Sequence, residues 1–126
     1  MRTPGRILVV DDDRPIAFFL KHVLERAGYQ VQGVDSGEHV EAALADFEPA
    51  AVILDVDLPG KSGLQVCRAI RADPARQDLV VVFATSHSFD ASGEHMCDAG
   101  ANWTFPKPIS PVNLLNKLRE LQVLPA

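Results

Sequence analysis

Polar side chains that could handle a phosphoryl group stand at the ends of short apolar runs. They are Asp11, Asp12, Asp13, Asp55, Asp57, Thr85 and Lys107. Carboxylates that gather in one place repel one another unless a cation shares them, and their oxygens suit Mg²⁺, which commonly bridges to a phosphate. A lysine ammonium and a threonine hydroxyl can hold the remaining phosphate oxygens. These residue types indicate phosphoryl transfer to a carboxylate, provided that the fold brings them together.

Five short segments have the pattern of β-strands. Three are continuous runs rich in β-branched residues, as expected of strands covered on both faces, at 7–10, 50–54 and 79–84. The alternating segment 29–34 predicts a less buried strand, and 102–106 predicts a weaker one. Pro106 cannot donate a ladder hydrogen bond, so the last strand is expected at an edge of the sheet.

Amphipathic stretches between these runs predict helices. The clearest carries an apolar stripe from Ile16 to Ala27, with Asp13 as its cap, Pro15 at its first position and Gly28 as its end. The others are a helix started by Ser36, one along 64–70, a short and weakly held one between 88 and 100, and a last one capped by Ser110.

Strand and helix alternate five times, which predicts an α/β fold with a mostly parallel sheet and helices on both faces. In such sheets ligands bind beyond the carboxyl ends of the strands. The candidate residues all follow strands, so we expect them to meet at this one edge.

Size and composition indicate one globular domain over residues 1–126, with its core at about 6–121. A net charge of −5 argues against direct binding to nucleic acid, and the apolar runs are too short to span a membrane. The two cysteines, Cys67 and Cys97, form no CxxC pair and are expected to be thiols. These features favour a cytoplasmic location.

Four motifs in register resemble the receiver domain of bacterial two-component response regulators. They are "ILVVDDD", "VILDVDLPGKSG", "FATS" and "FPKPI". The resemblance covers the chain from about Arg6 to Leu121. It implies a doubly wound, flavodoxin-like (βα)5 sandwich of three layers, with a five-stranded parallel sheet in the order 2-1-3-4-5.

The resemblance also implies a role for each site residue. Asp55 would be the phosphoacceptor and would hold Mg²⁺ together with Asp11, Asp12 and the backbone carbonyl of Asp57. Two further residues would act on the phosphoryl group, Thr85 by contact and Lys107 by pairing, and the Lys107–Pro108 peptide bond would be cis.

The phosphoryl donor implied by the resemblance is a phosphohistidine on a sensor histidine kinase or a histidine phosphotransfer protein. The output would be a changed protein-interaction surface around residues 86–107 and the last helix, for an unknown target, in a monomer or weak dimer. Thr104 stands where receivers usually carry Tyr or Phe, between Trp103 and Phe105. We therefore expect the signal to run through residues 86–100.

Other functions fit the sequence less well. A haloacid-dehalogenase-like phosphatase also uses a DxD after a strand, in which Asp57 would be the general acid and base, but there the DxD precedes the acidic pair. A zinc site at His87, His95 and Cys97 is weak because the spacing is loose. A receiver that only binds partners is disfavoured because every site residue is present. The chain is therefore not expected to be an enzyme beyond catalysing its own phosphorylation and dephosphorylation.

Overall fold

The computed structural model describes residues 3–85 and 100–125. Most of the helix expected between 88 and 100 lies outside these ranges, as do Ser86, His87, His95 and Cys97. Within the described ranges, no helix is long and apolar enough to cross a membrane.

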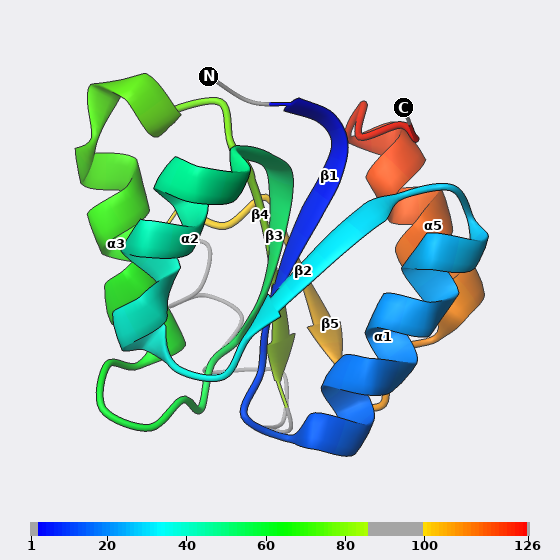
Figure 1. The fold of residues 1–126 in the computed structure, drawn as a ribbon, viewed down its shortest axis with the longest axis horizontal. Coiled ribbons are helices and arrows are strands. Elements are labelled where there is room, and N and C mark those ends of the chain that lie inside the picture. Colours follow the sequence, from blue (N-terminus) through cyan, green and yellow to red (C-terminus); the bar gives the residue numbers. More distant parts are fainter. Residues whose placement is uncertain (1–2, 86–99, 126) are drawn as a thin grey trace.

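Five parallel strands form one sheet in the order β2-β1-β3-β4-β5, which confirms the expected topology (Figure 1). The strands are β1 (Thr3–Val10), β2 (Gln30–Val34), β3 (Pro49–Asp55), β4 (Val80–Thr85) and β5 (Trp103–Pro106). The weaker strand β5 does lie at an edge. The arrowheads point to the lower side of the view in Figure 1, so the carboxyl ends of the strands share one edge of the sheet.

Helices cover both faces of the sheet, which gives three layers. Helices α1 (Arg14–Arg26) and α5 (Pro111–Glu120) lie on one face, and α2 (Val40–Phe47) and α3 (Gly63–Ala72) on the other (Figure 1). Successive side chains of a strand point to opposite faces, and the central strands are continuously apolar over 7–10, 51–54 and 80–84 because both faces are buried there. In β1, Ile7 and Val9 pack with α1 and α5, whereas Leu8 and Val10 pack with α2 and α3.

Local hydrogen bonds at the helix ends match most of the sequence signals. The Ile16 N–H donates to Asp13 Oδ1 at 3.2 Å, which confirms Asp13 as the cap of α1. The helix begins at Arg14, one residue before Pro15, and Gly28 follows it with φ at 101°. At α5 the Asn113 N–H donates to the Ser110 hydroxyl at 3.4 Å.

The start of the second helix differs from the expectation. A 3₁₀ turn, Gly37–His39, precedes α2, and the Ser36 hydroxyl caps no backbone N–H. The hydroxyl lies 2.9 Å from Nδ1 of His39 instead, because a side-chain partner is available one turn on. The tight turn brings Gly37 into a buried position.

Candidate functional site

Two buried carboxylates and one exposed carboxylate meet at the carboxyl edge of the central strands. Val10 pairs with Leu54 in the sheet, so the next residues, Asp11 and Asp55, emerge side by side. They are 3% and 5% exposed, and carboxylate oxygens of Asp11, Asp12 and Asp55 all lie within 4.8 Å of one another. The structure thus brings together the three acidic side chains predicted as metal ligands.

Lys107 reaches the same place from the chain that follows β5. Its Nζ lies 3.0 Å from Oδ2 of Asp11 and 3.3 Å from Oδ2 of Asp55. The backbone N–H of Lys107 donates to the carbonyl of Thr85 at 2.8 Å, and this hydrogen bond holds the Lys107 backbone beside the end of β4. The Lys107–Pro108 peptide bond is cis, as expected.

Each buried carboxylate is held in the same two-sided way. The N–H of Asp13 donates to Oδ1 of Asp11 at 2.9 Å, and the N–H of Asp57 donates to Oδ1 of Asp55 at 3.1 Å. In both residues Oδ2 faces the ammonium of Lys107. The backbone and Lys107 therefore fix the orientation of both carboxylates.

Thr85 and Asp57 occupy their expected positions at this edge. Ala84 pairs with Asp55 in the sheet, and Thr85 follows Ala84 as the last residue of β4 and is buried. The side chain of Asp57 is exposed, and its N–H has the structural role just described. That its carbonyl holds a metal ion stays a prediction.

The electrostatics of the cluster favour a bound cation. Burial is the largest effect on the pKa of Asp55 and raises it, and the Asp11 charge raises it further. The Asp57 N–H and Lys107 lower this pKa, but the net result is a raised pKa. Burial lowers the pKa of Lys107, but Asp11 and Asp55 outweigh burial and raise it above its ordinary value. Three carboxylates against one ammonium leave excess negative charge. This set of oxygen donors fits Mg²⁺.

Gly63 is a site residue that the sequence analysis missed. It opens α3, and a Cβ there would overlap the backbone oxygen of Asp55 and lie 2.8 Å from Cα of Val56. Its N–H donates to the carbonyl of Val56 at 2.9 Å. The chain therefore folds back so closely behind Asp55 that no side chain fits. The sequence carries a signal only for the adjoining capping box, in which the side chains of Ser62 and Gln65 each bond the other's backbone N–H.

Replacing Gly63 with alanine is expected to destabilise the fold by about 1–3 kcal/mol, the usual range for overpacking against atoms that cannot move freely. Denaturant unfolding measures this difference. Gly33→Ala is the matched control, since a Cβ at Gly33 meets only the Val9 carbonyl at an ordinary 3.8 Å. Equal free energies of unfolding for both variants would contradict the close contact.

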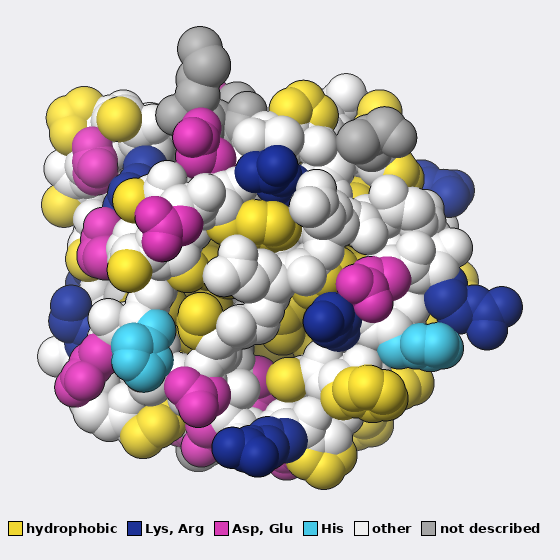
Figure 2. All heavy atoms as spheres, viewed as in Figure 1, with side chains coloured by type: hydrophobic (Ala, Val, Ile, Leu, Met, Phe, Trp, Pro, Cys, Tyr) yellow, Lys and Arg dark blue, Asp and Glu magenta, His cyan; other side chains and the backbone are white. Residues whose placement is uncertain are grey.

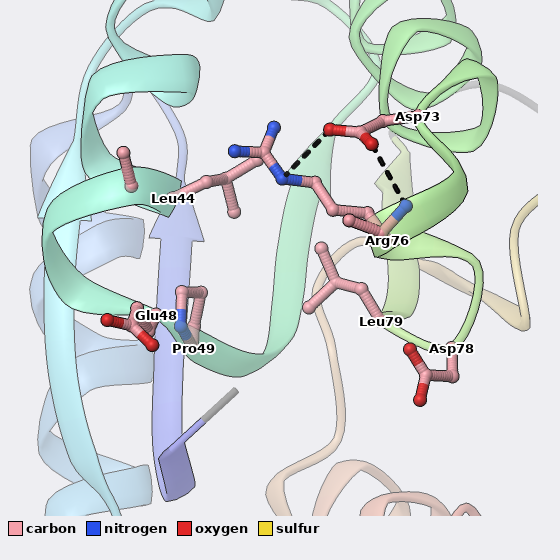
Figure 3. A pocket seen from close by; sticks show the side chains of 9 residues that line it. Leu44, Glu48, Pro49, Asp73, Arg76, Asp78 and Leu79 are labelled. Atoms are coloured by element: carbon pink, nitrogen blue, oxygen red, sulfur yellow. Dashed lines mark hydrogen bonds and ion pairs between the residues drawn. The ribbon is translucent and has the colours of Figure 1, made fainter. Parts of the chain in front are cut away.

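One well-defined cavity lies away from this cluster. It has a volume of about 490 Å³ and sits near the starts of β3 and β4, where Arg76 faces Asp73 at 3.8 Å (Figure 3). None of the predicted site residues lines it. Two smaller cavities border the carboxylate cluster, one lined by Asp11 and the other by Lys107. The predicted site residues therefore gather at the sheet edge and not in the cavity near the starts of β3 and β4.

Comparison with known proteins gives one family over most of the chain. The family model described as "Response regulator receiver domain" matches residues 7–119. The chain is 37% identical to the transcriptional regulatory protein GltR of Pseudomonas aeruginosa over 96% of its own length, and 37% identical to the response regulator MprA of Mycolicibacterium vanbaalenii over 94%. The chain spans about half of each of these relatives, namely 50%.

A solved structure agrees with these matches. The signal receiver domain of a signal transduction histidine kinase from Syntrophus aciditrophicus superposes with a TM-score of 0.86 and 31% identity, covering 93% of this chain and 89% of that one. Because one relative is named a transcriptional regulatory protein, our expectation of no nucleic-acid partner is not supported. On the face shown in Figure 2, lysine and arginine side chains are interspersed with acidic ones.

Proposed function

The chain belongs to the response regulator receiver domain family, and from this premise we propose that Asp55 accepts a phosphoryl group from a phosphohistidine. The donor would be a sensor histidine kinase or a histidine phosphotransfer protein. The observation that carries the proposal is the meeting of Asp11, Asp12, Asp55 and Lys107 at one sheet edge. The haloacid-dehalogenase-like alternative is not supported, since the family match is to receivers.

In the proposed step, a carboxylate oxygen of Asp55 attacks the phosphorus atom. The new O–P bond forms as the N–P bond of the donor breaks, and the imidazole nitrogen keeps the electron pair and takes up a proton. The Asp57 N–H orients the carboxylate through Oδ1. Lys107 lies between Asp11 and Asp55, and its ammonium would pair with the incoming phosphoryl oxygens.

The proposed metal ligands are the carboxylates of Asp11, Asp12 and Asp55 with the carbonyl of Asp57. Mg²⁺ bound there would neutralise negative charge on the phosphoryl oxygens. Without it, a phosphoryl group on Asp55 would lie beside the carboxyl groups of Asp11 and Asp12 with no metal ion to offset its charge. The same residues would serve dephosphorylation, in which a water oxygen attacks the phosphorus atom, the O–P bond to Asp55 breaks, and inorganic phosphate leaves with the Asp55 carboxylate restored.

The proposed output surface includes residues 86–107 and α5. The Thr85 hydroxyl would donate a hydrogen bond to the phosphoryl group. The resulting shift of Thr85 would be passed to the segment that follows β4. At its far end Trp103 is 46% exposed and lies under Lys117 of α5, whose Nζ is 3.7 Å from the ring centroid. This pair links β5 to α5 at the surface. The downstream target and the oligomeric state, monomer or weak dimer, belong to the proposal.

We also propose that the receiver occupies residues 1–126, with its core at about 6–121. The family match over 7–119 supports this extent. A cytoplasmic location stays a prediction from composition.

The proposal makes a direct prediction about metal removal. With Mg²⁺ and a small phosphodonor such as acetyl phosphate, intact-mass measurement is expected to show one added phosphoryl group per chain. With EDTA in place of Mg²⁺ the rate of gain should fall at least about 100-fold, because the ion supplies several kcal/mol of charge stabilisation. A rate that does not respond to the metal would contradict the assigned site.

A further inference from the structure

The connection between β2 and α2 packs directly against the loop that follows Asp55. Gly37 is buried at this contact. A Cβ on Gly37 would lie 2.7 Å from the carbonyl oxygen and 2.9 Å from Cβ of Lys61, and 3.0 Å from Cγ2 of Val66. Gly37 does not have the positive φ that favours glycine, so the contact and not the backbone conformation excludes a side chain.

A second glycine faces back across the same contact. A Cβ on Gly60 would lie 3.0 Å from Oε1 of Glu38, the residue next to Gly37. Gly37 thus faces the backbone of the other connection, whereas Gly60 faces the end of a side chain. Gly60, with φ at 75°, is also required by its backbone conformation, so Gly37 is the cleaner position to test.

The other end of this loop is tied to Asp55. The N–H of Asp57 donates to Oδ1 of Asp55, and Leu58 is buried in the core under α2 and α3. Lys61 is four residues beyond Asp57 in the same short loop. A displacement of the Lys61 backbone by several tenths of an ångström would therefore be passed toward the N–H that orients the Asp55 carboxylate.

We propose that Gly37 is a positioning residue for the Asp55 carboxylate. By carrying no side chain, it lets the Lys61 backbone settle where the Asp57 N–H reaches Oδ1 of Asp55. Gly37 thereby sets the affinity of the carboxylate cluster for Mg²⁺ and the rate at which Asp55 gains a phosphoryl group. This inference rests on the function proposed above and adds a residue from another connection to the site.

The test compares Gly37→Ala with Gly33→Ala, a glycine only four residues earlier whose Cβ would make an ordinary contact. Calorimetric titration with Mg²⁺ is expected to give a dissociation constant about tenfold weaker for Gly37→Ala, the lower range for a change to a residue that supports a metal ligand. Gly33→Ala should stay within about twofold of the wild type by the same argument. Equal affinity of Gly37→Ala and the wild type would overturn the proposal.

Two further measurements separate positioning from stability and from the proposed function. In EDTA, the amide resonance of Asp57 should shift in Gly37→Ala but not in Gly33→Ala, and an unchanged Asp57 resonance would overturn the proposal even if the wild type bound no Mg²⁺. Absence of Mg²⁺ binding by the wild type would count against the proposed function instead. If Gly37→Ala does not fold, a Mg²⁺ titration of the wild type followed by NMR decides. The amide resonances of Gly37 and Lys61 should then shift with the same midpoint as that of Asp57. Gly37 and Lys61 resonances that do not shift would overturn the proposal.

Discussion

Asp55→Asn is expected to lose all phosphoryl gain and, in the absence of metal, to unfold at a higher temperature than the wild type. The amide has no nucleophilic carboxylate oxygen, yet its oxygen can still accept the Asp57 N–H. The stability gain follows from the raised pKa of Asp55, which has burial as its largest cause and the Asp11 charge as a further one. A carboxyl whose pKa is raised in the fold destabilises the fold progressively as pH rises from the ordinary pKa through the raised one.

Intact-mass measurement and thermal unfolding in EDTA check the two parts of this result. Asp46→Asn is the matched control, because Asp46 is exposed on α2 and makes no part of the cluster. The control should gain a phosphoryl group as the wild type does and show no stabilisation. A phosphorylated Asp55→Asn variant would show that another residue is the acceptor.

Lys107→Ala is expected to slow phosphoryl gain by about 10²–10³-fold, the usual loss when one preorganised charge at a reacting centre is removed. The same change should leave Mg²⁺ binding intact or tighter. The reason is that the ammonium sits between Asp11 and Asp55 and repels a second cation. The variant thus separates holding the metal from handling the phosphoryl group.

Rates from a small phosphodonor at saturating Mg²⁺, together with a Mg²⁺ titration, measure the two effects. Lys21→Ala serves as control, since Lys21 is exposed on α1. Rates for Lys107→Ala within a factor of two of this control would remove Lys107 from the phosphoryl-transfer step.

The sequence predicts the sheet well because burial on both faces leaves a simple pattern. The runs that became β1, β3 and β4 are apolar at every position, and the structure buries alternate residues under opposite pairs of helices. Phe105 is buried, and Trp103 on the same side of β5 is partly exposed at the sheet edge. The convergence of Asp11, Asp55 and Lys107 was predictable because all three residues follow strands of a parallel sheet.

Contacts between backbones of distant segments could not be predicted in this way. The glycines at 37 and 63 look like ordinary turn or helix-start residues, and only the structure shows which atoms would collide with a side chain. Ser36 had the residue type of a helix cap, but its hydroxyl pairs with His39 because a 3₁₀ turn comes first. Such local competition between side-chain and backbone partners leaves no periodic signal.

The most direct test of the central claim is to locate the phosphoryl group on the wild-type chain. After treatment with Mg²⁺ and acetyl phosphate, borohydride reduction converts an aspartyl phosphate to a homoserine that survives proteolysis and can be assigned by peptide mass spectrometry. The account predicts a single modified position, Asp55. Modification at Asp11, Asp12 or Asp57 in its place, or none at any aspartate, would contradict it.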